Sequence, residues 1–108
     1  MTSQLSHQVE YDQNVARVHL TGEIDLAVAD QLYELLVSAA GQRPGLALQV
    51  DMKAVTFTDS SGVHALVRSR ARILAGGGEL RLINVSGMTA RVLHITGVYS
   101  YLCDDQQT

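Results

Sequence analysis

The chain contains no tryptophan and has one phenylalanine, one proline and one cysteine among its 108 residues. Because aromatic side chains are so scarce, we expect a core made mostly of valine, leucine, isoleucine and alanine. With a single cysteine, Cys103, the chain cannot form an internal disulfide bond, so nothing in it requires an oxidising compartment. We interpret Cys103 as a semi-buried apolar residue near the end of the chain.

An excess of basic charge and a long apolar run are also missing. The formal net charge is −3, which argues against a nucleic-acid partner because phosphate binding needs a net basic face. No apolar run approaches the roughly 18 residues of a membrane span, and the opening MTSQLSHQVE lacks the pattern of a signal peptide. We therefore expect a cytoplasmic protein that binds neither nucleic acid nor membranes, built as one domain.

The alternation of apolar and polar residues predicts the strands. Segments 7–11 and 15–22 flank the turn DQN and predict an antiparallel hairpin. Apolar runs at 46–50 and 79–85 predict two further strands. The segment VYSYL at 98–102 is predicted as a last edge strand.

Apolar residues at helical spacing predict three helices. The first covers 26–40, with Asp25 as its N-cap and Gly41 at its end. The second covers 61–75 and ends at the triple glycine 76–78. A third helix follows Ser86, its predicted N-cap, and ends at Gly97; its apolar positions are Met88, Val92 and Ile95.

The order of these elements predicts an α/β fold. Two strand–helix–strand crossovers in series follow the opening antiparallel hairpin, which implies a small mixed sheet that is mainly parallel after the hairpin, with three main helices. Only residues 1–4 and 104–108 have the polar composition of flexible tails, so the domain is expected to cover 5–103.

Two loops that follow predicted strands carry the polar residues of greatest interest, TGEID at 21–25 and TFTDSSG at 56–62. Because the carboxyl ends of parallel strands lie at one edge of a sheet, we expect these loops to be neighbours. They would bring together three acids and two hydroxyls: Glu23, Asp25, Asp59, Ser60 and Ser61.

The same residues do not predict catalysis. A hydrolase serine elbow has glycine two residues before and two after the serine, and neither Ser60 nor Ser61 has both. His64 lies one turn into the same helix, where its ring would point away from the loop. The four histidines lack paired metal-ligand spacing, and the glycines at 76–78 follow a helix rather than precede one, unlike a phosphate loop. We predict no enzymatic activity, no metal and no cofactor.

Two structural interpretations stand beside a functional one. The motif DSSG is a good helix N-cap, in which Asp59 or a serine accepts from the first backbone N–H groups, but this leaves one hydroxyl without a role. His64, Arg68 and Arg72 recur every four residues and predict a solvent-facing stripe. Such a stripe is either a solvated face or a contact for an acidic protein partner. His19 alternates with apolar residues and is predicted on the solvated face of its strand.

Three motifs together resemble the STAS domain, the family of bacterial anti-sigma factor antagonists. They are LTGEID, the spacing of Asp51, Val55 and Phe57 before DSSG, and GGGELRLINVSGMTARVLHITGV at 76–98. The resemblance covers about residues 5–103 and implies the STAS fold. Members of this family bind an anti-sigma factor that is also a serine kinase of the GHKL ATPase type, and this binding frees a sigma factor.

The resemblance also implies roles for individual residues. Ser60, the first serine of DSSG, is the expected phosphoacceptor; phosphorylation releases the kinase, and a serine phosphatase restores the protein. At a helix N-terminus, free N–H groups are expected to accommodate the phosphate. The expected partner-binding residues are Glu23, Asp25, Asp59, Ser61, Gly62, His64 and Arg68. Whether the free protein forms a weak homodimer stays open. The alternative function is a STAS subunit that docks on a transporter ATPase without phosphorylation.

Overall fold

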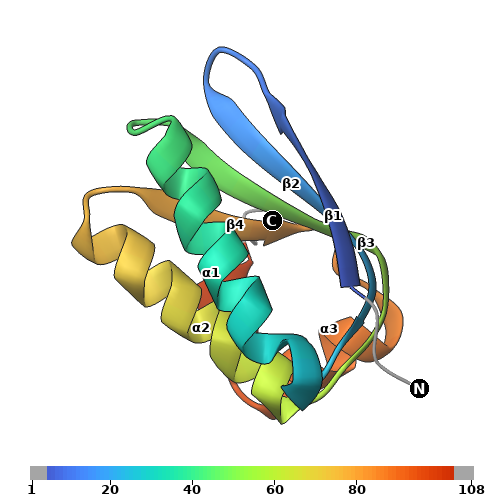
Figure 1. The fold of residues 1–108 in the computed structure, drawn as a ribbon. Coiled ribbons are helices and arrows are strands. Elements are labelled where there is room, and N and C mark those ends of the chain that lie inside the picture. The colour runs from blue at the N-terminus through green and yellow to red at the C-terminus, as the bar shows by residue number, and fades with distance from the viewer. Residues whose placement is uncertain (1–4, 104–108) are drawn as a thin grey trace.

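A four-stranded sheet in the order β1-β2-β3-β4 forms the centre of the computed structural model, which describes residues 5–103 (Figure 1). β1 and β2 are antiparallel, whereas β3 and β4 run parallel to β2. The strands are β1 Leu5–Tyr11, β2 Val15–Ile24, β3 Ala47–Thr58 and β4 Glu79–Ile83. The predicted α/β class, with an opening hairpin and parallel crossovers, is confirmed. The tails predicted at 1–4 and 104–108 lie outside the described residues.

Helices α1 Leu26–Gln42 and α2 Ser60–Ala75 connect the parallel strands and pack side by side against one face of the sheet (Figure 1). They confirm the first two predicted helices. Two shorter helices, α3 Gly87–Ile95 and α4 Tyr99–Leu102, follow β4. Within residues 5–103, no helix combines the length and the apolar character needed to cross a membrane.

The core lies between the sheet and helices α1 and α2. Alternate residues of the two central strands are buried on the helix side, namely Ala16, Val18, Leu20, Leu48, Val50 and Met52. Leu32 and Leu36 of α1 and Leu66 of α2 are completely buried against them. Burial of one such leucine contributes about 1.5–3 kcal/mol to the stability of the fold. The expected aliphatic composition of the core is confirmed, and Cys103 is more deeply buried than predicted, with 4% exposed.

The segment 98–102 is not a strand, so the predicted edge strand is wrong. Gly97 has a φ of 79°, which turns the chain, and the N–H of Leu102 then donates to the carbonyl of Val98 in a helical turn. This turn buries Leu102 completely and stacks the ring of Tyr99 on His94, with centroids 4.0 Å apart. Within the described residues after Gly97, backbone pairing with β4 is limited to a single parallel bridge between Cys103 and Leu82.

The third helix presents a different face from the one its apolar spacing predicts. Met88 and Ile95 are 59% and 77% exposed, whereas Thr89 and Leu93 are buried. Val92, the remaining predicted position, is half-buried and packs against the core. Since each pair is spaced as one helix face requires, the nine-residue helix could bury either, and packing against the sheet selects the second pair. Ser86 occupies the N-cap position, but its side chain makes no capping hydrogen bond.

The strand bounds also differ from the prediction: β1 begins at Leu5 and β2 continues to Ile24, each two residues beyond the predicted segment, and β3 and β4 differ as follows. β3 continues to Thr58, well beyond residue 50, because it stays paired with β2 through two register irregularities. β4 ends at Ile83 instead of residue 85, and Asn84 follows with a φ of 58°, a left-handed conformation that a strand does not continue. The carboxyl-terminal half of β3 therefore has β2 as its only strand neighbour among the described residues, and leads directly into the DSSG motif.

Candidate functional site

The two loops expected to be neighbours are joined by the sheet itself. β2 and β3 end side by side, with Ile24 opposite Thr58 in the register. Beyond the last pair, the N–H of Asp59 donates to the carbonyl of Ile24 across 3.2 Å. The three acids and two serines consequently stand at one edge of the sheet, and we call this set the serine rim: Glu23, Asp25, Asp59, Ser60 and Ser61.

Both helices that start at this edge begin with an aspartate N-cap. One carboxylate oxygen of Asp59 accepts from the N–H groups of Ser61 and Gly62, at 2.9 and 3.1 Å. The side chain of Asp25 accepts from the N–H of Ala27 at 3.0 Å in the same way. These bonds satisfy N–H groups that the start of a helix otherwise leaves without a partner. Of the two capping alternatives for DSSG, the structure therefore has the aspartate as the cap.

Neither serine hydroxyl is needed for the cap. Ser60 is the first residue of α2 and is exposed, and among residues 5–103 its hydroxyl makes no hydrogen bond. Ser61, one residue further into the helix, is half-buried. Of the two hydroxyls, that of Ser60 is the more accessible to another protein.

Gly62 allows the start of α2 to lie directly against the end of β2. A Cβ atom at this position would collide with the hydroxyl of Thr58 and would lie 2.6 Å from Cγ2 and 3.0 Å from the carbonyl oxygen of Ile24. Thr58 and Ile24 are both buried, so neither has room to withdraw. The glycine thus determines how close the first turn of α2, with Ser60, lies to the end of β2.

Most of the N–H groups at the start of α2 already have a partner, so the sequence expectation that free N–H groups accommodate an anion holds at most for the N–H of Ser60 among the described residues. Asp59 occupies those of Ser61 and Gly62 with its carboxylate, and its carbonyl accepts from Val63. A negatively charged group on Ser60 would therefore stand beside the carboxylate of Asp59 rather than replace it. The capping interaction raises the density of negative charge around the serine hydroxyl.

The predicted basic stripe on α2 is only partly presented to solvent. His64 and Arg72 are exposed. Arg68 instead leans towards α1, where its guanidinium lies 4.5 Å from the ring centre of Tyr33 and 3.4 Å from a carboxylate oxygen of Asp30. Its Nε atom is buried without a hydrogen-bond partner. Arg68 consequently contacts α1 while 40% of its side chain remains exposed. His64 is the member of the stripe nearest in sequence to the serine rim.

Two exposed apolar side chains flank the serine rim and were missed by the sequence reasoning. Leu26, directly after Asp25, is 75% exposed, and Phe57, opposite Glu23 in the register, is 40% exposed. The exposure of Leu26 could have been predicted from the helical spacing, because the buried face of its helix begins at Val28 and Leu26 lies off that face. Apolar side chains beside an accessible hydroxyl are suited to contact with another protein.

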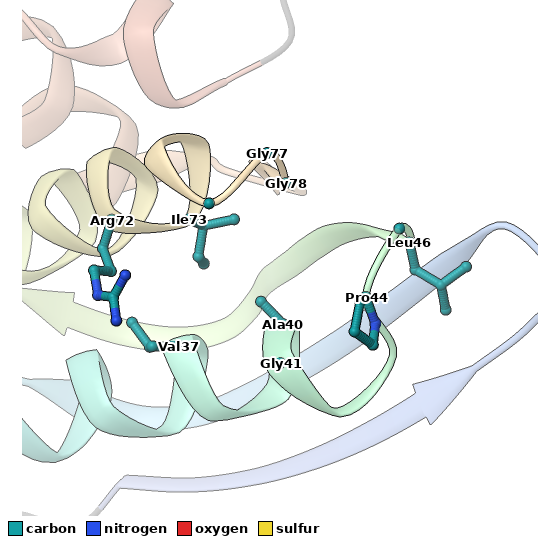
Figure 2. Close-up of a pocket in the computed structure, with 11 residues that line it drawn as sticks. Val37, Ala40, Gly41, Pro44, Leu46, Arg72, Ile73, Gly77 and Gly78 are labelled. Carbon is teal, nitrogen blue, oxygen red and sulfur yellow. The ribbon is translucent and has the colours of Figure 1, made fainter.

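Among residues 5–103, no group of three or more histidine, cysteine or acidic side chains could hold a metal ion. A cavity of about 310 Å³ lies at the opposite ends of α1 and α2, where Val37, Ala40, Pro44 and Ile73 line it (Figure 2). Because it adjoins the last turns of the two helices, it does not communicate with Ser60.

Comparison with known proteins places these features in a family. The family model of the STAS domain matches residues 6–105. The anti-sigma-B factor antagonist of Bacillus subtilis (strain 168) is 36% identical over 90 residues, which span 83% of this chain and 81% of that protein.

Solved structures agree with the sequence match. An anti-sigma factor antagonist from Mycobacterium paratuberculosis superposes with a TM-score of 0.78 at 26% identity, over 92% of this chain and 83% of that one. The anti-sigma factor antagonist SpoIIAA, in its unphosphorylated form, gives a TM-score of 0.74 at 22% identity, over 94% and 90% of the two chains. SpoIIAA in its phosphorylated form gives 0.66 at 22% identity, over 92% and 89% of the two chains. The SpoIIAA structures support the same fold.

Proposed function

This chain belongs to the STAS domain family, and from that membership we propose that it is an anti-sigma factor antagonist. In this function it binds an anti-sigma factor and so frees a sigma factor, which places its action in the cytoplasm. Support comes from the Bacillus subtilis relative, an anti-sigma-B factor antagonist by name, which aligns over most of both chains. The serine rim, with its accessible hydroxyl and flanking apolar side chains, is the proposed contact surface.

The binding is proposed to be switched by phosphorylation of Ser60. The observation that carries this proposal is the exposed hydroxyl of Ser60 at the first position of α2, next to a cap that leaves it without a structural role. The kinase is the anti-sigma factor itself, of the GHKL ATPase type, and a serine phosphatase removes the phosphate. The partner contacts the rim and the first turns of α2, through Glu23, Asp25, Asp59, Ser61, His64 and Arg68. Gly62, which is buried, acts in this surface by setting the position of the first turn of α2.

A phosphate on Ser60 acts on the interface while the fold is retained. It adds about −1.5 to −2 charges beside the carboxylate of Asp59, whose bonds to Ser61 and Gly62 keep it in place. The hydroxyl is exposed, so the phosphate extends into solvent and no core contact changes. In the complex, the same group must be desolvated close to acidic side chains, which costs binding free energy.

The loss of binding free energy on phosphorylation determines how completely the partner is released. A loss of about 3–4 kcal/mol on phosphorylation weakens the complex several-hundred-fold, because each 1.4 kcal/mol is a factor of ten in the dissociation constant. A change of that size separates a bound from a released antagonist without a rearrangement of the domain.

The proposal is tested with purified GHKL-type anti-sigma factors from the same genome and ATP. Mass spectrometry should find the phosphate on Ser60, and calorimetry should show that the phosphorylated protein, like Ser60→Asp, binds several-hundred-fold more weakly. Ser60→Ala should bind constitutively. Ser61→Ala is the matched control, and it should still be phosphorylated and released.

Two results would contradict the proposed function. Phosphate on Ser61 alone would overturn the site, and equal affinity of the phosphorylated and unphosphorylated forms would overturn the switch. Binding to a transporter ATPase that is indifferent to Ser60→Asp would favour the alternative of a docking subunit.

A further inference from the structure

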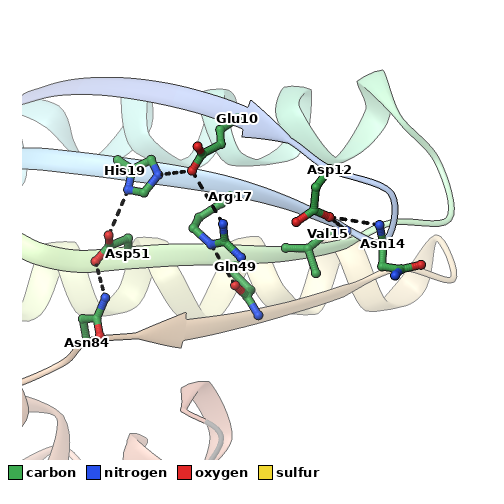
Figure 3. A network of polar contacts seen from close by, with 9 residues as sticks. All are labelled: Glu10, Asp12, Asn14, Val15, Arg17, His19, Gln49, Asp51 and Asn84. Carbon is green, nitrogen blue, oxygen red and sulfur yellow. Dashed lines mark hydrogen bonds and ion pairs between the residues drawn. The ribbon is translucent and has the colours of Figure 1, made fainter.

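The face of the sheet opposite α1 and α2 carries a polar network centred on His19 (Figure 3). Its Nε2 atom lies 2.7 Å from a carboxylate oxygen of Glu10 on β1, and its Nδ1 atom lies 2.9 Å from a carboxylate oxygen of Asp51 on β3. The imidazole therefore bridges the two neighbours of its own strand, β2. Residue His19 is on the outer face, as predicted, but it is bonded on both sides.

Only a protonated ring satisfies both contacts. A carboxylate accepts hydrogen bonds and donates none, while a neutral imidazole carries a single N–H. With a neutral ring, one of its two nitrogens would direct a lone pair at a carboxylate oxygen. The imidazolium form has an N–H on each nitrogen and makes two charge-assisted hydrogen bonds.

The carboxylates of Asp51 and Glu10 differ in how strongly their surroundings restrain them. Asp51 is 13% exposed, and its second oxygen accepts from the side chain of Asn84 at 2.9 Å and from the N–H of Lys53 at 3.0 Å. Glu10 is 59% exposed, and its other charged neighbour is Arg17, at 3.5 Å. A neutral His19 would keep its N–H on Asp51, which cannot move, and would release Glu10.

β1 is the element that depends on this contact. It is an edge strand paired only with β2, and none of its residues is fully buried. Leu5, Val9 and Tyr11 pack partly against the core, so cross-strand pairs supply a large share of what holds the strand.

We propose that His19 is a proton-operated latch: the protonated ring ties Glu10 of β1 to Asp51 of β3 across β2, and loss of the proton loosens β1 from the sheet. The hydrogen bond to Glu10, followed by that to Asp51, raises the pKa of His19 above its ordinary value of 6.5. Because the pKa is raised on folding, the latch is complete below pH 6.5, as long as Glu10 and Asp51 stay ionised, and is lost as the pH rises through the folded-state pKa of His19.

The charges closest to the ring of His19 are consistent with a raised pKa of that residue. On the face that His19 occupies, the two acids that contact the ring come from the strands on either side. The cations on this face favour the neutral ring and come from three strands: Arg17 on β2, Lys53 two residues after Asp51 on β3, and Arg81 opposite Gln49 on β4. The neutral neighbours are Gln8 directly opposite on β1, Gln49 beside Arg17, and Asn84 after β4.

The test is a pH titration of the full chain by NMR. The His19 ring signals should titrate above pH 6.5, and across the same interval the β1 amides, corrected for intrinsic exchange, should lose protection against hydrogen exchange, while those of β3 keep it. In Glu10→Gln, the His19 midpoint should move down towards 6.5 and the β1 transition should disappear. His7→Gln, which removes an exposed histidine of β1 itself, is the matched control and should preserve the transition.

Two results would overturn the latch. The first is a His19 ring that titrates at or below pH 6.5 in the unaltered chain. The second is a loss of β1 protection with the same pH dependence in Glu10→Gln or His19→Gln, which would show that another group controls the strand.

Discussion

The replacement Gly62→Ala tests how closely α2 sits on the end of β2. The added Cβ would meet the Thr58 hydroxyl and would approach Cγ2 and the carbonyl oxygen of Ile24 to 2.6 and 3.0 Å. That carbonyl is held by the N–H of Asp59, so it cannot withdraw without breaking the contact that joins the two loops.

Two opposing effects decide the size of the change. Overpacking in a closed site costs about 1–3 kcal/mol. Alanine recovers up to about 1 kcal/mol relative to glycine in a helix interior, and less in the first turn, where Gly62 lies. The net expectation is a loss of about 1–2 kcal/mol in the free energy of unfolding. For a domain of this size, the melting temperature falls by about 4–15 °C.

Gly41→Ala is the matched control because it makes the same chemical change in open space. Gly41 lies in the last turn of α1, and no atom comes within 4 Å of a Cβ built there. This variant should be neutral or stabilised by up to about 1 kcal/mol. Thermal and urea unfolding followed by circular dichroism measure both variants. If Gly62→Ala were as stable as Gly41→Ala, the close approach that positions Ser60 would be refuted.

Two further predictions concern aspartates that accept backbone hydrogen bonds. Asp59→Ala should lower the free energy of unfolding by about 1 kcal/mol because the α2 cap is lost, whereas Asp59→Asn can still cap and should change it by only a few tenths of a kcal/mol. Urea unfolding distinguishes the two variants. Equal losses of stability in both would contradict the capping role of Asp59. Asp12, in the β1–β2 turn, accepts from two backbone N–H groups that lower its pKa below the ordinary 3.8. Its stabilising contribution is present above pH 3.8 and is lost as the pH falls through the lower folded-state pKa. Urea midpoints measured from pH 5 to pH 2 should therefore decline more steeply in the unaltered chain than in Asp12→Asn, and parallel curves would argue against it.

Local patterns in the sequence were sufficient for the order of elements and for the place of the serine. Alternation predicted the hairpin, and helical spacing bounded by aspartate and glycine predicted α1 and α2. The loops around Asp25 and Ser60 could be placed side by side because parallel strands must end at one edge of a sheet. These inferences depend on residues within one or two turns of each other, or on topology alone.

The features that the sequence predicted wrongly or only in part all depend on contacts between distant segments. Whether Met88 or Leu93 faces the core is a matter of how α3 meets the sheet, since both spacings are helical. The same holds for Arg68, whose guanidinium packs on Tyr33, 35 positions earlier in the chain, so that its side chain is only partly exposed. Residue 98 onwards could form a strand or a helical turn, and the burial of Leu102 decided for the turn.

The serine rim combines both kinds of information. Its composition and its location at a strand-to-helix turn were written in the local sequence. Which group caps α2, how near Gly62 lies to Ile24, and how much negative charge surrounds Ser60 were decided by tertiary packing. Local preference is set by a residue and its neighbours three or four positions away. By contrast, a packing contact depends on the positions of two backbones that the rest of the fold brings together.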